Sequence, residues 1–242
     1  MQMTIRLSFS CFLCFVLILL SGCGSGVSLT EAEKADVDKF ITVRGTDAIL
    51  GYLGFGVDTK NIDEKQVLKY LKYLVSKGAN VNAKDNDGIT PLHLATAIGN
   101  VTLVRYLVAQ GANVNAQDTD GFVPLHNTAK GNVGIAKTLV SKGANVNAKA
   151  NDGQTPLHRA LDSENLEIIK FLVSKKADVN SRNERGWTPL HYAAIGGNIE
   201  IVQFLVSKGA DINIKSNDGE TPFDFAKEMN NTAVKEYLAN LK

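Results

Sequence analysis

Adjacent pairs of apolar residues, spaced four positions apart, recur along this chain at a nearly fixed interval. Leu103, Val104, Leu107 and Val108 form the first set, and equivalent sets lie within 135–140, 168–173 and 201–206. This spacing places one apolar stripe on one face of a helix. A single helix pair cannot cover such a stripe alone. The pattern therefore predicts short amphipathic helices that stack on one another and bury a continuous core.

A second pattern precedes each stripe. Gly-x-Thr-Pro-Leu-His stands at 88–93, 153–158 and 186–191, a copy with valine for threonine at 121–126, and a divergent copy at 219–224. Glycine suits a tight turn, threonine is a good helix N-cap, and proline fits the first helical position. We therefore expect a turn and then a helix at each proline, with Gly99 and Gly111 ending the two helices of the first copy.

The motif and its period of about 33 residues resemble the ankyrin repeat. The resemblance covers roughly the region from Thr46 to the C-terminus. It implies an all-α repeat solenoid, in which helix–turn–helix units carry β-turn fingers and helical caps close both ends. We expect an N-terminal cap with a degenerate first repeat at 30–82, four full repeats within 83–220 (about 85–117, 118–149, 150–182 and 183–215), and a capping repeat at 216–242.

Two copies depart from the pattern. The copy at 123–154 is one residue short near Lys130, in the turn between its helices, where we expect a local change in curvature. The next copy has Glu164 and Lys176 where helix-ending glycines usually stand. We expect those two turns to be stiffer or strained.

Residues 1–22 differ in kind from the rest. Arg6 is their only charged residue, and 7–20 are almost wholly apolar. Fourteen residues are short for a membrane-spanning helix, which needs ~20, but suit the centre of a secretion signal. Leu20-Ser-Gly-Cys23 resembles the bacterial lipobox, which implies cleavage of 1–22, lipid on Cys23 and a tether at 23–29. An ordinary secretion signal and an uncleaved anchor remain the alternatives.

The same resemblance bears on location. In many Gram-negative bacteria, aspartate after the lipidated cysteine retains the protein in the inner membrane, and Gly24 stands here instead. We therefore expect a lipid-anchored protein of the bacterial cell envelope, at the outer membrane. Cys11 and Cys14 fall within the predicted signal, so the folded body contains no cysteine.

Charge gives little further direction. The net charge of the chain is +1, and without 1–22 its basic and acidic residues are equal in number and alternate. No electrostatic footprint for nucleic acid appears, so nucleic acid is not an expected partner.

Four histidines are the residues that most suggest chemistry. His93, His126, His158 and His191 occupy the same place in successive copies. The ankyrin resemblance implies that such a histidine bonds the backbone and the nearby threonine (Thr90, Thr155, Thr188). Copies on separate repeats cannot converge on one ion, because Zn–N bonds are ~2.0–2.1 Å. The Asp-x-Asp-Gly turns lack the ligands of a calcium loop. We predict no metal, no cofactor and no enzymatic activity.

Partner binding is instead expected on the concave face that the resemblance implies. Its candidates are turn tips, residues before the motif threonine, and ends of first helices: Asn86, Asp87, Ile89, Ile98, Thr119, Asp120, Phe122, Lys130, Asp152, Gln154, Asp162, Glu184, Arg185, Trp187, Ile195, Asn217 and Asp218. Aromatic residues among polar ones are typical interface anchors. For Phe122, contact and mere shielding of its own turn stay equally open, whereas for Trp187 we favour contact.

Three functions follow, in order of preference. The first is a membrane-anchored, monomeric module that binds another protein in the cell envelope. The second is a protein that neutralises a secreted toxin or lipase in the same compartment. The third, a lipoprotein hydrolase, lacks any nucleophile and base that could be paired.

Overall fold

The computed structural model describes residues 29–32, 34–35, 38, 49, 64–130 and 133–241. The predicted signal, Cys23 and most of the predicted tether lie outside these residues, as does much of the predicted N-terminal cap. Within the chain, 1–85 and 86–242 form two compact units.

The first unit contains helix α4, Glu64–Ser76. Val67, Tyr70, Leu71 and Leu74 are buried and follow the i, i+3, i+4, i+7 spacing of one helix face. On another face, the Tyr73 hydroxyl donates to a carboxylate oxygen of Asp38 at 3.1 Å.

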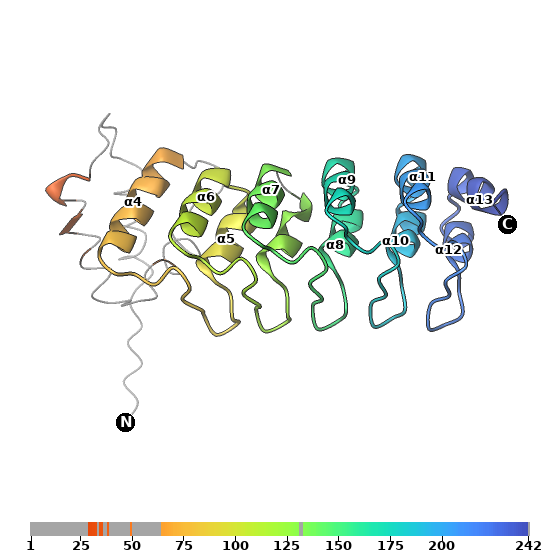
Figure 1. Cartoon of the computed structure of the whole chain (residues 1–242), viewed down its shortest axis with the longest axis horizontal. Coiled ribbons are helices and arrows are strands. Elements are labelled where there is room, and N and C mark those ends of the chain that lie inside the picture. The colour runs from red at the N-terminus through yellow and green to blue at the C-terminus, as the bar shows by residue number, and fades with distance from the viewer. Residues whose placement is uncertain are drawn as a thin grey trace, which may run out of the picture. The chain divides into compact units, whose positions relative to one another are not determined.

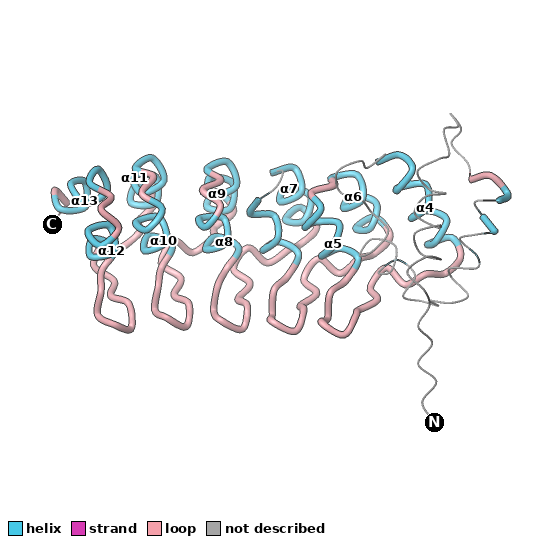
Figure 2. Tube along the Cα trace, turned by 180° about the vertical axis from the view of Figure 1, so that it is seen from behind, coloured by secondary structure: helices cyan, strands magenta, loops and turns pink. Residues whose placement is uncertain are grey.

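The second unit is a row of helix pairs (Figure 1). In Figure 2 the loops that join one pair to the next project as fingers on one side of this row. The described residues include no strand, and the predicted all-α repeat solenoid is confirmed. The pairs are α5 (Pro91–Ile98) with α6 (Val101–Ala109), η2 (Pro124–Lys130) with α7 (Val133–Ser141), α8 (Pro156–Asp162) with α9 (Leu166–Ser174), α10 (Pro189–Gly196) with α11 (Ile199–Ser207), and α12 (Pro222–Glu228) with α13 (Thr232–Ala239).

The predicted apolar stripes form the core of this unit. Leu103, Val104 and Leu107 of α6 are 0% exposed, and their counterparts on α7, α9 and α11 are buried likewise. The first helices contribute the motif leucine, for example Leu92 and Leu157, also 0% exposed. Each stripe is covered by its own partner helix and by neighbouring pairs, as a stacked array requires.

The short copy differs from its neighbours in helix type. Its motif predicts an α-helix from Pro124, but Pro124–Lys130 is a 3₁₀ helix. The Thr128 hydroxyl donates to Leu125 O, three residues back, whereas in α5 the Thr96 hydroxyl donates to Leu92 O, four residues back. The missing residue leaves less chain for the helix, and Val123 cannot supply a hydroxyl N-cap. A tighter helix accommodates both changes.

Both residues that replace helix-ending glycines in the third copy adopt left-handed backbone conformations, as does Asn230 in the last copy. Glu164 has φ 49° and Lys176 φ 68°. Glycines at the place equivalent to Lys176, including Gly143 and Gly209, have φ 88° and 89°. An L-residue with a Cβ is strained in this region, by ~1–2 kcal/mol. The turn therefore keeps its geometry and the side chain bears the strain.

Replacing Lys176 with glycine is expected to stabilise the protein by about 0.5–1 kcal/mol, because relief of strain exceeds the entropy that glycine adds to the unfolded chain. Urea unfolding measures the difference. The matched control is Gly143→Lys, where a Cβ would meet no atom within 4 Å, so that only the backbone conformation is tested. It should lower the free energy of unfolding by about 1 kcal/mol. If the free energy of unfolding changed with the same sign in both variants, backbone strain at Lys176 would not be the explanation.

Candidate protein-binding surface

Each motif histidine joins its own repeat to the next finger. In the first copy, His93 Nδ1 lies 2.8 Å from Thr90 Oγ1 and accepts the Thr90 N–H at 3.1 Å. His93 Nε2 lies 3.1 Å from the carbonyl oxygen of Phe122. The same long-range contact joins His126 to Gln154, His158 to Trp187 and His191 to Glu220, at 3.1–3.3 Å.

These bonds define the protonation of the imidazoles. Because Nε2 faces a carbonyl oxygen, it must carry the proton and donate, which leaves Nδ1 as the acceptor. Burial lowers the pKa of the His158 imidazole from the ordinary 6.5 to about 4. Burial also lowers the pKa of His126 and of His191. The neutral ring is therefore the form that the stack requires.

The fingers are linked to one another at their tips. Backbone N–H groups donate to carbonyl oxygens of the preceding finger from Thr119 to Asp87, from Asn151 to Asp120, from Glu184 to Asp152 and from Asn217 to Arg185, at 2.8–3.0 Å. At Gly153 the next finger is so close that a Cβ would lie 2.9 Å from Asn183 Cα. The spacing between fingers is thus held by backbone contacts.

Short polar side chains close individual fingers. Asp118 Oδ1 accepts the N–H of Phe122 at 2.8 Å, and Asn183 Oδ1 accepts the N–H of Trp187 at 3.0 Å. The backbone of each finger also pairs across its base, with the Asp118 N–H donating to Phe122 O and the Asn183 N–H to Trp187 O. Phe122 and Trp187 are consequently held on both sides, by their own finger and by a histidine.

The predicted tip residues are mostly exposed. Exposed are Asn86, Asp87, Thr119, Asp120, Glu184, Arg185, Asn217 and Asp218. Asp152 is half-buried, because its carboxylate accepts from the backbone and side-chain amides of Gln154 at 2.9 and 2.8 Å. Each finger tip carries one acid: Asp87, Asp120, Asp152, Glu184 or Asp218.

The candidates at the ends of the first helices lie away from the tips. Ile98 and Ile195 are half-buried, and Asp162 is exposed with a carboxylate oxygen 3.9 Å from Arg159 Nη1. Lys130 ends η2, and its side chain falls outside the described residues. The structure therefore separates these candidates into a tip row and a first-helix row.

The residues before the motif threonine form a third row, half-buried throughout: Ile89, Phe122, Gln154, Trp187 and Glu220. Phe122 packs edge-on against His126, with ring centroids 5.2 Å apart, and the Arg159 guanidinium lies 5.4 Å from its ring. Trp187 packs edge-on against Tyr192 and Phe225, at 5.6 and 5.0 Å. Both rings thus pack against the stack and keep part of their surface in solvent.

Sequence reasoning missed the residues that support these two rings. Each of them is the third residue after a motif proline, directly after the motif histidine or its equivalent, so Arg159, Tyr192 and Phe225 occupy one repeat position. Tyr192 also accepts a hydrogen bond from Asn183 Nδ2 at 3.0 Å. The large side chains at this position in the last three copies, after Leu94 and Asn127 in the first two, were the available signal.

Two buried polar atoms in this row have no hydrogen-bond partner within the described part of the chain. They are Gln154 Oε1 and Trp187 Nε1. An unpaired buried donor or acceptor costs about 1–3 kcal/mol. Packing rather than hydrogen bonding therefore holds the Trp187 indole in place.

The described residues offer no other site of obvious chemistry. No group of three or more His, Cys, Asp or Glu side chains among them is placed to hold a metal ion. Nor does any helix within the described ranges have the length and apolar character needed to cross a bilayer.

Comparison with known proteins agrees with this geometry. A family model for ankyrin repeats (three copies) matches residues 63–150, 100–183, 146–216 and 175–242. A fowlpox virus (strain NVSL) protein described as an ankyrin repeat protein, FPV223, is 41% identical over 49 residues. That match covers 20% of this chain and 35% of the viral protein, so the chain spans about a third of its relative's length.

The stack is expected to lose stability in mild acid. Between the folded pKa of about 4 and the unfolded 6.5, the unfolded chain binds more protons at His158. Stability from this residue is therefore complete above pH 6.5 and is lost as the pH falls toward 4. The full loss is roughly 3 kcal/mol, and His126 and His191 add to it.

Urea unfolding between pH 7.5 and 4.5 tests this expectation. The control is the variant His158→Gln. It should be less stable than the wild type at neutral pH, and its free energy of unfolding should depend less steeply on pH. Parallel pH profiles for the two proteins would show that His158 does not contribute the effect.

Proposed function

The chain belongs to the ankyrin-repeat family, and from this premise we propose that it is a membrane-anchored module that binds another protein in the bacterial cell envelope. The family is generally one of protein–protein interaction modules, and the match indicates no catalytic family. We propose in addition that this chain carries a lipid anchor and that its partner lies in the cell envelope.

One observation carries the binding role. Phe122 and Trp187 are each fixed by a finger and by a histidine from the preceding repeat, yet remain half-buried rather than enclosed. Rigid aromatic side chains lose little conformational entropy on binding, so they make effective contacts. The tip row lies beside them and adds polar contacts at a fixed spacing. This arrangement supports recognition of a folded surface or an extended segment.

The charge of the tips favours one class of partner. Every tip contributes an acid, and Arg185 is the only basic residue among the predicted tip candidates. The Arg185 guanidinium lies 5.3 Å from the Trp187 ring, so part of its charge is directed at its own finger. A partner that presents basic residues around an apolar centre would complement this surface.

The proposed location is supported by the sequence of residues 1–23. An apolar run is followed by Leu-Ser-Gly-Cys, and a polar domain begins shortly after Cys23. One acyl chain binds a bilayer only marginally, whereas two or three, at ~0.8 kcal/mol for each buried CH₂, hold a protein durably. A short tether would keep the repeats close to the membrane, where an envelope partner could be captured.

Replacing Phe122 and Trp187 together with alanine is expected to reduce partner affinity at least about 100-fold, since buried aromatic anchors typically contribute ~2 kcal/mol or more each. Partners are first identified by co-purification with the wild-type protein from envelope extracts, and affinity is then measured with the purified partner. Identification of a secreted toxin or lipase would assign the module a neutralising role.

Two controls make this test specific. Trp187→Phe keeps an aromatic ring against Tyr192 and Phe225 and removes the unpaired donor, so fold and most of the binding should remain. Circular dichroism and thermal unfolding must show that the double variant is folded. Unchanged affinity in a folded double variant would exclude this row from the interface.

Replacing Cys23 with serine is expected to abolish lipid attachment and membrane anchoring, because the sulfur would carry the diacylglycerol. The wild-type chain, produced in a bacterial host, should be recovered with membranes, and mass spectrometry should show an acylated N-terminal peptide that begins at Cys23.

Cys11→Ser and Cys14→Ser serve as matched controls, because both residues lie in the segment proposed to be removed. These variants should be processed as the wild type is. A wild-type N-terminal peptide without lipid would exclude the anchor and leave the protein-binding role to be tested separately.

A further inference from the structure

The second helices carry a column of aromatic side chains that the finger surface does not use. Its positions repeat with the period of the array: Tyr106, Thr138, Phe171, Phe204 and Tyr237. All five side chains are half-buried, so each of the four rings packs partly against its own stack and partly faces solvent. Only Thr138 interrupts the series.

Basic residues flank this column on both sides. The position just before it holds Arg105, Lys137 and Lys170, and the position four residues after it holds Lys142, Lys175 and Lys208. All six are exposed. The ammonium groups lie close to the rings: Lys175 is 5.9 Å from Phe171, and Phe204 is approached by Lys208 at 5.7 Å and by Lys170 at 5.9 Å.

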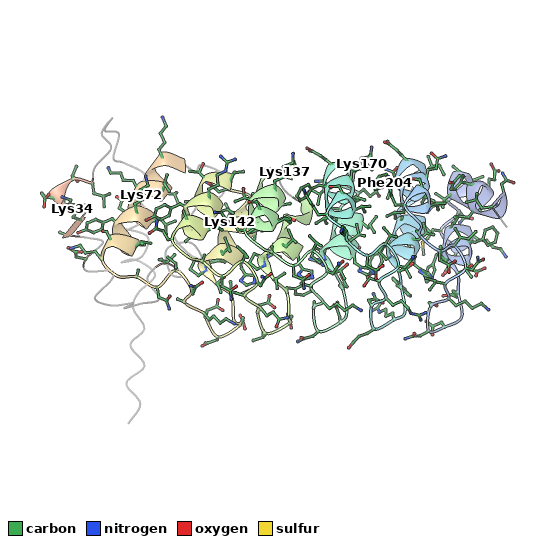
Figure 3. The ribbon with its side chains drawn as sticks, in the orientation of Figure 1. Lys34, Lys72, Lys137, Lys142, Lys170 and Phe204 are labelled. Carbon is green, nitrogen blue, oxygen red and sulfur yellow. The ribbon has the colours of Figure 1, made fainter. Side chains whose placement is uncertain are left out.

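This face and the finger tips have opposite charge. From α6 to α11 the acids on the second helices are Glu167 and Glu200, and Glu200 pairs with Lys170 at 3.2 Å. The tips carry one acid each. The near-zero total charge of the body therefore conceals two faces of opposite sign. In Figure 3, Lys137, Lys170 and Phe204 lie on the second helices, on the side of the row away from the fingers.

We propose that this basic and aromatic face of the second helices docks on an anionic phospholipid surface. Lysine side chains can lay their methylene stems along apolar surface while the ammonium reaches an anionic headgroup. Tyrosine and other amphipathic aromatic rings favour the level of the headgroups. Each Lys or Arg near an anionic leaflet adds to the attraction, which salt screens.

The repetition of the pattern favours a lipid surface over a single macromolecular partner. The full combination of an aromatic residue and two flanking basic residues occurs in α9, at Lys170, Phe171 and Lys175, and parts of it recur in α6, α7 and α11. The face therefore offers several similar contacts at the interval of the repeat. Mobile headgroups can occupy such an array without a unique sequence or fold. Docking in this orientation would direct the finger tips, with one acid each, away from the bilayer, where they would remain accessible to a protein. The inference does not require lipid on Cys23.

Vesicle flotation tests the proposal with the full chain carrying Cys23→Ser. Vesicles of phosphatidylcholine alone are compared with vesicles that also contain phosphatidylglycerol. The apolar segment 7–20 partitions into both vesicle types alike, so the difference in binding between them reports the contribution of the repeats. We expect at least about tenfold tighter binding to the anionic vesicles, weakened by salt. The triple variant Lys137→Gln, Lys142→Gln and Lys175→Gln should abolish this preference.

The matched control removes the same charge from the fingers, through Lys149→Gln, Arg182→Gln and Lys215→Gln, and should leave the preference unchanged. The Phe122 and Trp187 double variant should also retain it, which separates this inference from the proposed protein-binding role. Equal affinity of the wild-type body for the two vesicle types would overturn the proposal. Equal loss of the preference for anionic vesicles in the two triple variants would overturn it as well. If a thymidine oligonucleotide bound as tightly as the anionic vesicles and lost its affinity in the Lys137, Lys142 and Lys175 triple variant, that result would assign the face to nucleic acid instead.

Discussion

A buried neutral imidazole that reaches from one repeat to the backbone of the next is the interaction on which the rest of this structure depends. Each motif histidine accepts at Nδ1 from its own helix start and donates at Nε2 to a carbonyl oxygen about 29 residues later. That carbonyl belongs to the variable residue of the next motif, the one directly before its threonine or, in the short copy, before Val123. The bond that joins repeats therefore also positions the side chains best placed to meet a partner.

The fold separates charge in a way that total composition conceals. Each finger tip carries an acid because the turn there uses Asp or Glu, and although the fingers also hold Lys and Arg, basic residues outnumber acids along the second helices, beside a column of aromatic rings. A body with nearly equal numbers of basic and acidic residues can thus present two surfaces with different partners. Electrostatic arguments from net charge alone would miss both surfaces.

Particular residues show where sequence reasoning succeeded and where it stopped. The period and the apolar pairs predicted the all-α solenoid, because spacing along a helix determines which side chains share a face. The 3₁₀ form of η2 was not predicted, since it depends on how one missing residue is absorbed within a packed stack. For Trp187 the sequence favoured contact with a partner, which stays a prediction. Only the structure shows that its ring also packs against Tyr192 and Phe225, which come from its own repeat and the next.

The sequence by itself determined the repeat, the helix starts and the positions that vary, because these follow from local backbone preferences and periodicity. Only the tertiary structure decided which variable side chains meet, how deeply Phe122 and Trp187 are buried, and that the Lys and Arg side chains of successive second helices lie on one face. These properties depend on the stacking of neighbouring repeats, which brings together residues about 30 positions apart through contacts that no local pattern encodes.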